Sequence, residues 1–216
     1  MFLSRIAWCW LVVCCYFFSA GIIRAQTSLV LPDQDGDGIA DAWEQEVYHT
    51  DLRRLDTDGD GYDDRTEIIN KYNPKGTGNV LEADYDADSL SDRLELLFGT
   101  NPMMADTDGD SRPDGEEVVA AYSPTSTDPL PLQKSIFINL KRQTLEPRVA
   151  DIAIATYPIS SGLPRTPTPV GTFKILQKHP RAWSNSAKLW MPYWMHFSGR
   201  GHGLHELPEW PGGRKE

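Results

Sequence analysis

The sequence predicts a mainly β fold preceded by a small module of loops and short helices. An acidic motif recurs four times between residues 33 and 122, and apolar and polar residues alternate in short runs from residue 134 onward. The chain has 216 residues, of which 40% are hydrophobic. That length and composition suit one ordinary domain and one smaller module.

The N-terminal segment has the pattern of an export signal. Arg5 precedes an apolar run over residues 6–23, and Ala25 offers a small residue at a cleavage position. We therefore expect residues 1–25 to be a signal peptide, with an uncleaved membrane anchor through residues 6–23 as the alternative. Either segment predicts an exported protein of the periplasm or cell envelope.

Cysteine occurs only within this leader, at Cys9, Cys14 and Cys15. After cleavage the remaining chain would contain no cysteine. We therefore expect neither disulfides nor thiol chemistry from residues 26–216 themselves.

Charge divides the chain into two parts. Residues 33–117 contain 25 Asp and Glu against 7 Lys and Arg, hence a net charge of −18, whereas the whole chain carries −10. Residues 133–216 contain 12 basic and 5 acidic residues, hence a net charge of +7. The basic part suits an anionic polymer of the cell wall, and no nucleic-acid partner is expected.

A twelve-residue acidic motif accounts for the negative part. Its copies are DQDGDGIADAWE from Asp33, DTDGDGYDDRTE from Asp56, DYDADSLSDRLE from Asp84 and DTDGDSRPDGEE from Asp106, which marks an internal repeat. Each copy has carboxylates at positions 1, 3, 5, 9 and 12, and position 7 can offer a backbone carbonyl. Such a loop can wrap a hard cation that needs about six to eight oxygens, so we predict structural Ca²⁺ in each loop.

The predicted Ca²⁺ ligands occupy these six positions in all four loops. They are Asp33, Asp35, Asp37, Ile39, Asp41, Glu44, Asp56, Asp58, Asp60, Tyr62, Asp64, Glu67, Asp84, Asp86, Asp88, Leu90, Asp92, Glu95, Asp106, Asp108, Asp110, Arg112, Asp114 and Glu117. A solvated acidic stretch is the alternative. Four copies in the same phase, each ending in glutamate, favour the metal loops.

The spacing between loops differs from that of paired EF-hands. Only 11 residues separate Glu44 from Asp56, too few for one outgoing and one incoming helix. Residues 33–122 instead resemble the bacterial thrombospondin type 3-like calcium repeats. In those repeats a loop leads into one short helix and then a turn.

Position 6 of each loop needs a positive φ angle, which glycine adopts without steric cost. Gly38 and Gly61 fit this pattern, whereas Ser89 and Ser111 depart from it. We therefore expect weaker binding in the third and fourth loops. Without Ca²⁺ the carboxylates repel one another, so we expect a loose module that Ca²⁺ converts into a stiff spacer.

A linker and a β domain are predicted after the repeats. Residues 123–133 are rich in Pro, Ser and Thr and are assigned as the linker. Strands are expected in SIFINL (135–140), VADIAIATYPIS (149–160) and GTFKIL (171–176). Four tryptophans crowd the end of the chain and are expected in a core or on a sheet face, with a ligand-stacking wall as the alternative: Trp183, Trp190, Trp194 and Trp210.

Four landmarks in residues 134–216 carry a family resemblance. They are Ser161-Gly162, the segment TPVGTF at residues 168–173, MPY at residues 191–193, and a Gly-x-x-x-His segment from Gly201 to His205. In this order they resemble the L,D-transpeptidase catalytic domain of the YkuD type. The resemblance implies a β-sandwich, of which residues 134–216 would be the N-terminal part.

The resemblance also implies a reaction, namely acyl transfer between peptidoglycan stem peptides by a cysteine nucleophile. His205 matches the family histidine upstream of that cysteine and would be the catalytic general base. His196 and His202 have weaker claims, and Ser198 lacks the setting of a nucleophilic serine. The Ser-His-Gly-Cys block of the family is missing from this sequence, which would then be a fragment or a natural truncation.

Two functions remain open from the sequence. The first is an exported L,D-transpeptidase that forms 3-3 cross-links and carries a calcium-binding spacer. The second is a non-catalytic, calcium-dependent protein of cell-wall binding or adhesion with a truncated transpeptidase remnant. Because the sequence lacks the thiol, it leaves open whether the protein is an enzyme.

Overall fold

The structure is a computed structural model that describes residues 31–80, 82–185, 188–199 and 201–206. The predicted leader (1–25), Trp210 and the rest of residues 207–216 lie outside the described residues. Within the described ranges, no helix combines the length and the apolar character that crossing a bilayer requires. The chain forms two compact units, residues 1–81 and 82–216, and each is described by itself.

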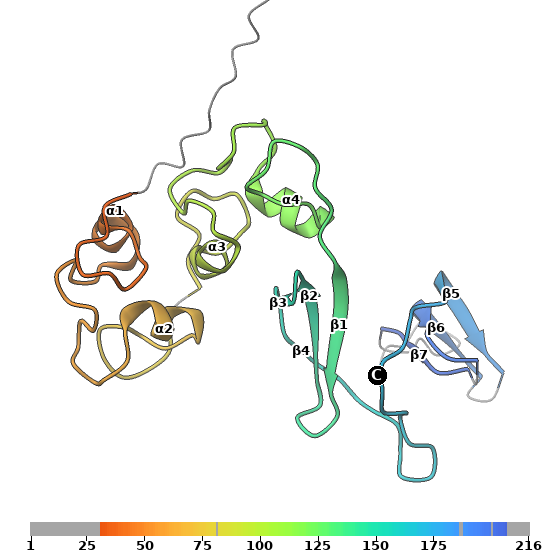
Figure 1. Cartoon of the computed structure of the whole chain (residues 1–216). Helices are drawn as coiled ribbons and strands as arrows, with labels where there is room; N and C mark the ends of the chain where they lie inside the picture. Colours follow the sequence, from red (N-terminus) through yellow and green to blue (C-terminus); the bar gives the residue numbers. More distant parts are fainter. Residues whose placement is uncertain (1–30, 81, 186–187, 200, 207–216) are drawn as a thin grey trace, which may run out of the picture. The chain divides into compact units, whose positions relative to one another are not determined.

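The first unit contains the first two acidic loops, and each loop runs directly into a short helix (Figure 1). Loop 1 enters α1 (Asp41–Trp43), which continues as the π-helical turn η1 (Glu44–Tyr48) and ends at His49 in the left-handed conformation. Loop 2 enters α2 (Asp64–Ile69). Asp63 caps α2, because its carboxylate accepts a hydrogen bond from the Thr66 backbone N–H at 2.7 Å.

The second unit begins with loops 3 and 4, which enter α3 (Asp92–Phe98) and α4 (Asp114–Ala120). Both helices end at a left-handed residue, Gly99 after α3 and Ala121 after α4. Their inner faces form a small core of Leu90, Leu94 and Val118. Ile152 and Ile154 pack against it, so the β region and the second pair of loops share apolar contacts.

The segment predicted as a linker folds back along the end of α4. Tyr122 forms an isolated antiparallel bridge with Pro131, and the Leu132 N–H donates to the Ala121 carbonyl at 2.8 Å. Lys134 Nζ donates to the Val119 carbonyl at 3.3 Å. These bonds hold the start of the β region close to α4.

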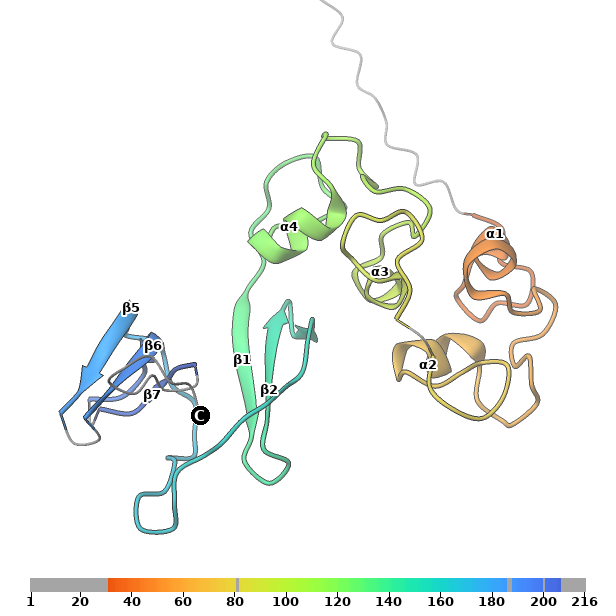
Figure 2. The same ribbon diagram turned by 180° about the vertical axis from the view of Figure 1, so that it is seen from behind.

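The first sheet is antiparallel and contains four strands, β1 (Lys134–Asn139), β2 (Thr144–Val149), β3 (Ile152–Ala153) and β4 (Tyr157–Pro158). The strand order is β1-β2-β3, and β4 also pairs with β2. The β1–β2 hairpin is in register from Lys134 opposite Val149 to Asn139 opposite Thr144, and Figure 2 shows its long arms.

The second sheet is also antiparallel, in the order β5 (Gln177–Ser184), β6 (Leu189–His196) and β7 (Gly203–Leu204). Trp183 lies opposite Trp190 in the β5–β6 register, and their rings meet edge to face with centroids 5.1 Å apart. Arg181 extends over the other side of the Trp190 ring at 4.3 Å. These tryptophans therefore stabilise the hairpin through cross-strand pairing.

The prediction of a mainly β fold is confirmed, with two antiparallel sheets and few helices. The strand predicted at 135–140 corresponds to β1. The strand predicted at 171–176 is wrong, because this segment is extended without a ladder and the strand begins at Gln177. Strand β2 was missed because Pro147 lowers the strand signal, and of residues 149–160 only short pieces pair.

Candidate functional site

Each acidic loop is held in shape by hydrogen bonds from its own backbone to its carboxylates. In loop 2, Asp56 Oδ1 accepts from the Gly59 N–H at 2.6 Å and Oδ2 from the Gly61 N–H at 2.8 Å. The same two bonds form in loops 1 and 4, and loop 3 has the bond to position 6. The first aspartate therefore closes each loop around its own side chain.

The other aspartates follow the same regular scheme. In loop 1, Asp35 accepts from the Asp37 N–H at 3.2 Å and Asp37 from the Ile39 N–H at 2.7 Å. Asp41, at position 9, reaches back to the N–H of Gln34 at 2.7 Å. The other three loops repeat these bonds at the same positions. In Asp35, Asp37, Asp86 and Asp108 the second oxygen is buried and has no hydrogen-bond partner.

The glutamate at position 12 of every loop is buried and keeps an oxygen without a hydrogen-bond partner. Glu44, Glu67, Glu95 and Glu117 are at most 5% exposed, and Oε2 of each has no partner. In Glu117 the other oxygen lies 3.0 Å from the Arg112 guanidinium. A buried carboxylate oxygen without a partner is costly in water-excluded surroundings, so these oxygens fit the donor set of a hard cation.

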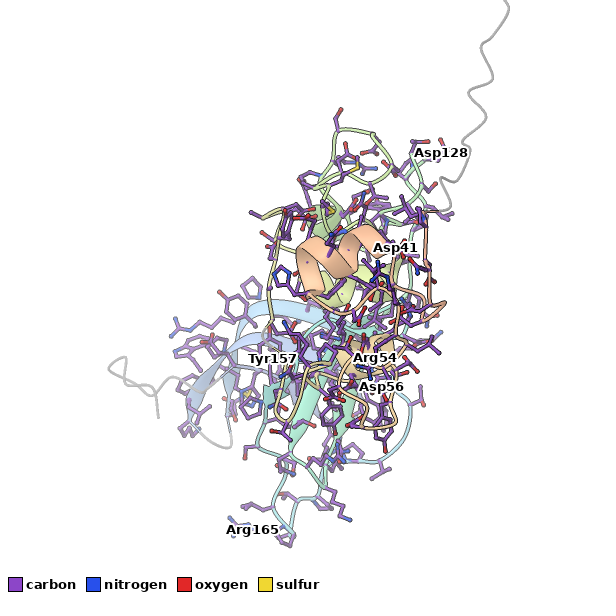
Figure 3. The ribbon with its side chains drawn as sticks, turned by 90° about the vertical axis from the view of Figure 1, so that its left-hand side faces the viewer. Asp41, Arg54, Asp56, Asp128, Tyr157 and Arg165 are labelled. Carbon is purple, nitrogen blue, oxygen red and sulfur yellow. The ribbon has the colours of Figure 1, made fainter. Side chains whose placement is uncertain are left out.

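In each loop the aspartates at positions 1, 3 and 5 bring one oxygen apiece to within 4.8 Å of one another. Burial raises the pKa of Glu95 to about 9 and that of Glu44 and Glu67 to about 7, and neighbouring carboxylates add to the effect. Asp56 behaves oppositely, because the Gly61 N–H lowers its pKa and Arg54 adds to this. Figure 3 labels Arg54 and Asp56 side by side.

The backbone adopts a positive φ at position 6 of all four loops. The angles are 92° at Gly38, 102° at Gly61, 79° at Ser89 and 77° at Ser111. A serine in this region costs on the order of 1 kcal/mol relative to glycine. Loops 3 and 4 therefore carry strain that loops 1 and 2 avoid, and weaker Ca²⁺ binding there stays a prediction.

The loops are organised in two pairs, a feature that the sequence reasoning missed. Thr50 and Thr100 each donate a side-chain hydrogen bond to the glutamate that ends the preceding loop, Glu44 at 2.9 Å and Glu95 at 3.4 Å. The signal was present in the sequence as a second period of about 50 residues. It is visible in two sets of equivalent residues: Thr50, Thr57 and Tyr72 in the first pair, and Thr100, Thr107 and Tyr122 in the second.

A threonine at position 2 also recurs, in the second loop of each pair. Thr57 donates from Oγ1 to Asp64 Oδ2 at 2.7 Å, and Thr107 donates to Asp114 Oδ2 at 2.6 Å. The first and third loops have Gln34 and Tyr85 at this position. The position 9 aspartates of the second and fourth loops are therefore held by two bonds to the same threonine.

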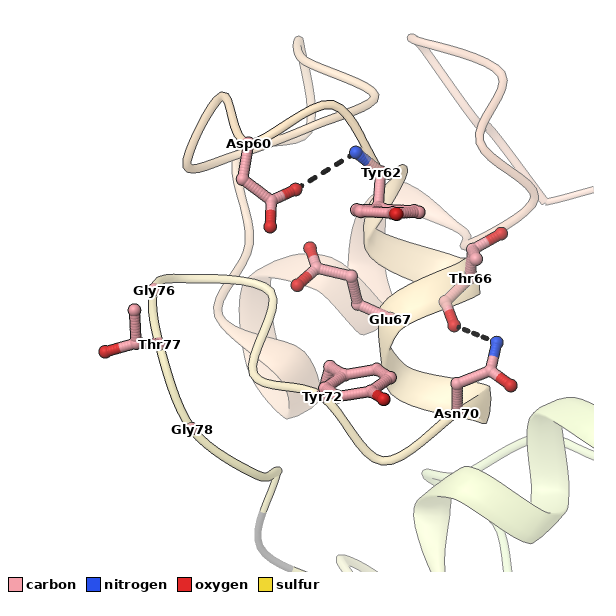
Figure 4. Close-up of a pocket in the computed structure, with 9 residues that line it drawn as sticks. All are labelled: Asp60, Tyr62, Thr66, Glu67, Asn70, Tyr72, Gly76, Thr77 and Gly78. Atoms are coloured by element: carbon pink, nitrogen blue, oxygen red, sulfur yellow. Dashed lines mark hydrogen bonds between the residues drawn. The ribbon is translucent and has the colours of Figure 1, made fainter.

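A cavity of about 410 Å³ lies beside loop 2, and it is lined in part by Glu67, the glutamate at position 12 of that loop (Figure 4). Asp60, Glu67 and the rings of Tyr62 and Tyr72 line it, together with Thr66, Asn70 and residues 76–78. The Asn70 amide is turned toward the helix, since it donates to the Thr66 carbonyl at 2.7 Å. The cavity gives solvent and ions a route to the buried Glu67 carboxylate.

In the second sheet, His205 directly follows β7 and is exposed. Its Nδ1 lies 2.6 Å from the Glu206 carbonyl oxygen. Because a carbonyl only accepts, Nδ1 is the donor, and Nε2 is the acceptor nitrogen of the neutral ring. The ring stacks on Trp194 with centroids 5.9 Å apart, which fixes its orientation on the sheet.

The other candidates have different partners. Ser198 Oγ lies 2.7 Å from His202 Nδ1 and also accepts from the His202 N–H at 3.3 Å, which is the geometry of a local turn. His196 stacks on Trp194 with centroids 6.3 Å apart. The structure therefore places Ser198 with His202 rather than with His205.

The family landmarks meet in two groups. The Gly162 N–H donates to Thr168 Oγ1 at 2.7 Å, and Gln143 holds Ser161 through its backbone N–H at 2.9 Å. In the second sheet, the Glu206 N–H donates to the Pro192 carbonyl at 3.1 Å. Each group thus joins landmarks that are separated in sequence.

Comparison with known proteins bears on the C-terminal part of the chain. Residues 133–215 match the family model of the L,D-transpeptidase catalytic domain, YkuD. No curated protein and no solved structure matches the chain. The match supports an L,D-transpeptidase-type function in general, with peptidoglycan peptides as the kind of partner on which that family acts.

Proposed function

We propose that the protein is an exported peptidoglycan L,D-transpeptidase that forms 3-3 cross-links and carries a calcium-binding spacer. The observation that carries this proposal is the family match over residues 133–215, within which the Nδ1 of His205 faces the Glu206 carbonyl and Nε2 is the nitrogen that would take up a proton. The net charge of +7 on residues 133–216 favours approach to an anionic wall polymer.

In this proposal His205 is the general base of a cysteine acyl transferase. Nε2 takes the thiol proton, and the thiolate attacks the carbonyl that precedes the terminal D-alanine of a tetrapeptide stem. The peptide bond breaks, the departing D-alanine amine receives the proton, and a thioester forms. An amine of a neighbouring stem then attacks the thioester, which restores the thiol and completes the cross-link.

The nucleophile in this reaction is a cysteine that residues 134–216 do not contain. Sequencing the reading frame through the codons that follow Glu216 tests this requirement first. A Ser-His-Gly-Cys block about 15 to 35 residues beyond His205 supports the proposal, since nucleophile and base must come within hydrogen-bond reach. A stop codon directly after Glu216 removes the thiol and contradicts the enzymatic proposal.

The repeats supply the spacer in this proposal. Each loop would hold Ca²⁺ through its carboxylates, the carbonyl at position 7 and the glutamate at position 12, whose Oε2 has no other partner. Bound Ca²⁺ compensates the charge of the loops and stiffens them. The leader, residues 1–25, would direct export to the periplasm or cell envelope, with residues 6–23 as a possible anchor.

A non-catalytic role in calcium-dependent wall binding is the second candidate. It needs only the four acidic loops and the net charge of +7 on residues 133–216, without a thiol. The two candidates differ in a simple assay. Sedimentation with purified peptidoglycan in Ca²⁺ and in chelator measures binding, whereas only the enzyme changes the stem peptides.

A further inference from the structure

One carboxylate cluster joins two repeats, unlike the clusters that lie within single loops. Asp37 and Glu44 of loop 1 and Asp64 of loop 2 bring one oxygen each to within 4.8 Å of one another. Among the residues that the structure describes, the other four such clusters each belong to one loop. Asp64, a residue of loop 2, therefore lies beside the carboxylates of loop 1.

Two members of this cluster are fully buried, and two keep an oxygen without a hydrogen-bond partner. Glu44 and Asp64 are fully buried, at 0% exposed. Glu44 Oε2 and Asp37 Oδ2 are buried without a hydrogen-bond partner. The unpartnered Oε2 of the fully buried Glu44, in a cluster with two further carboxylates, points to a cation between them, because three such charges repel one another strongly without one.

The start of α2 holds Asp64 in this position. The Asp64 N–H donates to the Leu55 carbonyl at 2.8 Å, and both carboxylate oxygens accept from Thr57. The next residue, Arg65, donates from Nη1 to the Gly38 carbonyl at 3.0 Å. These bonds fix the helix end against loop 1, so Asp64 is preorganised toward the first loop.

The second pair of loops resolves the same contact differently. There the Gly115 N–H donates to Asp88 Oδ2 at 2.7 Å. A Cβ at position 115 would lie 2.5 Å from the Asp88 carbonyl oxygen, so glycine permits this close approach. Asp88, the equivalent of Asp37, thus has its second oxygen satisfied by backbone.

We propose that loops 1 and 2 share a site for a divalent, oxygen-seeking cation of the Ca²⁺ class, in which Asp64 completes the ligand set of loop 1. This inference rests on the proposed calcium function and deepens it. The first pair of repeats is then one binding unit, and occupancy of loop 1 requires the second repeat. In the second pair, a hydrogen bond from the Gly115 N–H to Asp88 takes the place of the additional carboxylate ligand.

Terbium luminescence in the full-length chain tests this assignment. Trp43 lies inside loop 1, so the Tb³⁺ signal that is excited through tryptophan and lost in Trp43→Phe reports that loop. Asp64→Asn is expected to weaken Tb³⁺ at this site about tenfold or more. The matched control is Asp63→Asn, which removes the same charge one residue away and keeps an N-cap residue, and it should leave the affinity unchanged.

Further variants distinguish the loss of a metal-binding carboxylate from the loss of folding. Asp114→Asn alters the equivalent position in the other pair and should leave the Trp43 signal unchanged. Asp64→Glu keeps the carboxylate and should bind Tb³⁺ in loop 1 more tightly than Asp64→Asn. Circular dichroism in saturating Ca²⁺ confirms that each variant is folded.

Three results would overturn the assignment. They are an unchanged Trp43-reported affinity in Asp64→Asn, an equal loss in Asp114→Asn, and an Asp64→Glu variant no better than Asp64→Asn. If the unsubstituted chain binds neither Tb³⁺ nor competing Ca²⁺, the proposed calcium function itself fails. That result is distinct, because it appears before any variant is compared.

Discussion

The acidic repeats and the second β-sheet place their functional groups in opposite ways. A repeat assembles its carboxylates within twelve consecutive residues, and its own backbone N–H groups orient them. In the sheet, His205 depends on Trp194 and Pro192, which lie on a neighbouring strand. The comparison teaches that the repeats depend on charge compensation, whereas the histidine depends on strand packing.

Removing Ca²⁺ should have the largest effect and should be confined to the repeats. Ligand binding to the folded state stabilises it by about 2.7 kcal/mol per site when free ligand exceeds the Kd 100-fold. We expect chelation to lower the melting temperature of the helical signal of the repeats in a circular-dichroism melt, while the β signal persists. Equal melting curves in Ca²⁺ and in chelator would contradict the proposed spacer.

The pH dependence of stability in the Ca²⁺-free chain also distinguishes the repeats from the β-sheet. Burial raises the pKa of Glu44 from 4.5 to about 7 and that of Glu95 from 4.5 to about 9. A raised folded-state pKa means that the protonated form is favoured by folding. The stabilisation is therefore complete below pH 4.5 and is lost as pH rises through about 7 and then about 9.

For Glu44 alone the loss corresponds to about 3 kcal/mol. Urea unfolding at a series of pH values, in chelator, should show the repeats most stable near pH 4 to 5. Saturating Ca²⁺ should reverse the trend, because binding requires ionised carboxylates. Stability that rises with pH in chelator would contradict the buried state of these glutamates.

In the β-sheet, Gly203→Ala should disturb the surface that orients His205. A Cβ at residue 203 would meet the Trp194 ring at 2.6 Å, so the ring must move. We expect a destabilisation of about 1–3 kcal/mol, typical of overpacking, together with altered Trp fluorescence. Gly199→Ala is the control, since a Cβ there meets nothing within 4 Å, and an equal effect of both would contradict the packing argument.

The smallest expected effect on stability comes from position 6 of the loops, which is glycine in the first pair and serine in the second. Ser89→Gly and Ser111→Gly remove a side chain from a backbone with positive φ and should stabilise by about 1 kcal/mol. Gly61→Ala, whose Cβ would meet no neighbour, should destabilise by a similar amount through backbone strain alone. Melting temperatures in saturating Ca²⁺ measure all three, and a loss of stability in the serine variants would contradict the assignment of strain.

Local features of this chain were predictable and distant ones were not. The motif alone predicted the positive φ at position 6 of each loop, whereas the role of its carboxylates as Ca²⁺ ligands stays a prediction. It did not predict that Asp64 faces loop 1, because that contact depends on how α2 packs. Strand β2 was not predicted, because its residues include Pro147, which lowers the strand signal. The strand is defined by its pairing with β1.

The same limit applies to the histidine. Its family landmark was recognisable in sequence, but its tautomer follows from the Glu206 carbonyl and its orientation from the Trp194 ring. The contact with Trp194 depends on the pairing of β6 with β7. Sequence could therefore nominate His205 without saying which nitrogen is free.

The most direct test is release of D-alanine from a tetrapeptide stem by the product of the whole reading frame, followed by mass spectrometry. We predict release that a thiol-alkylating reagent abolishes, that His205→Ala lowers by at least about 100-fold, and that His202→Ala retains. No release, or release that persists in His205→Ala or after alkylation, would contradict the assignment of a cysteine acyl transferase with His205 as its base.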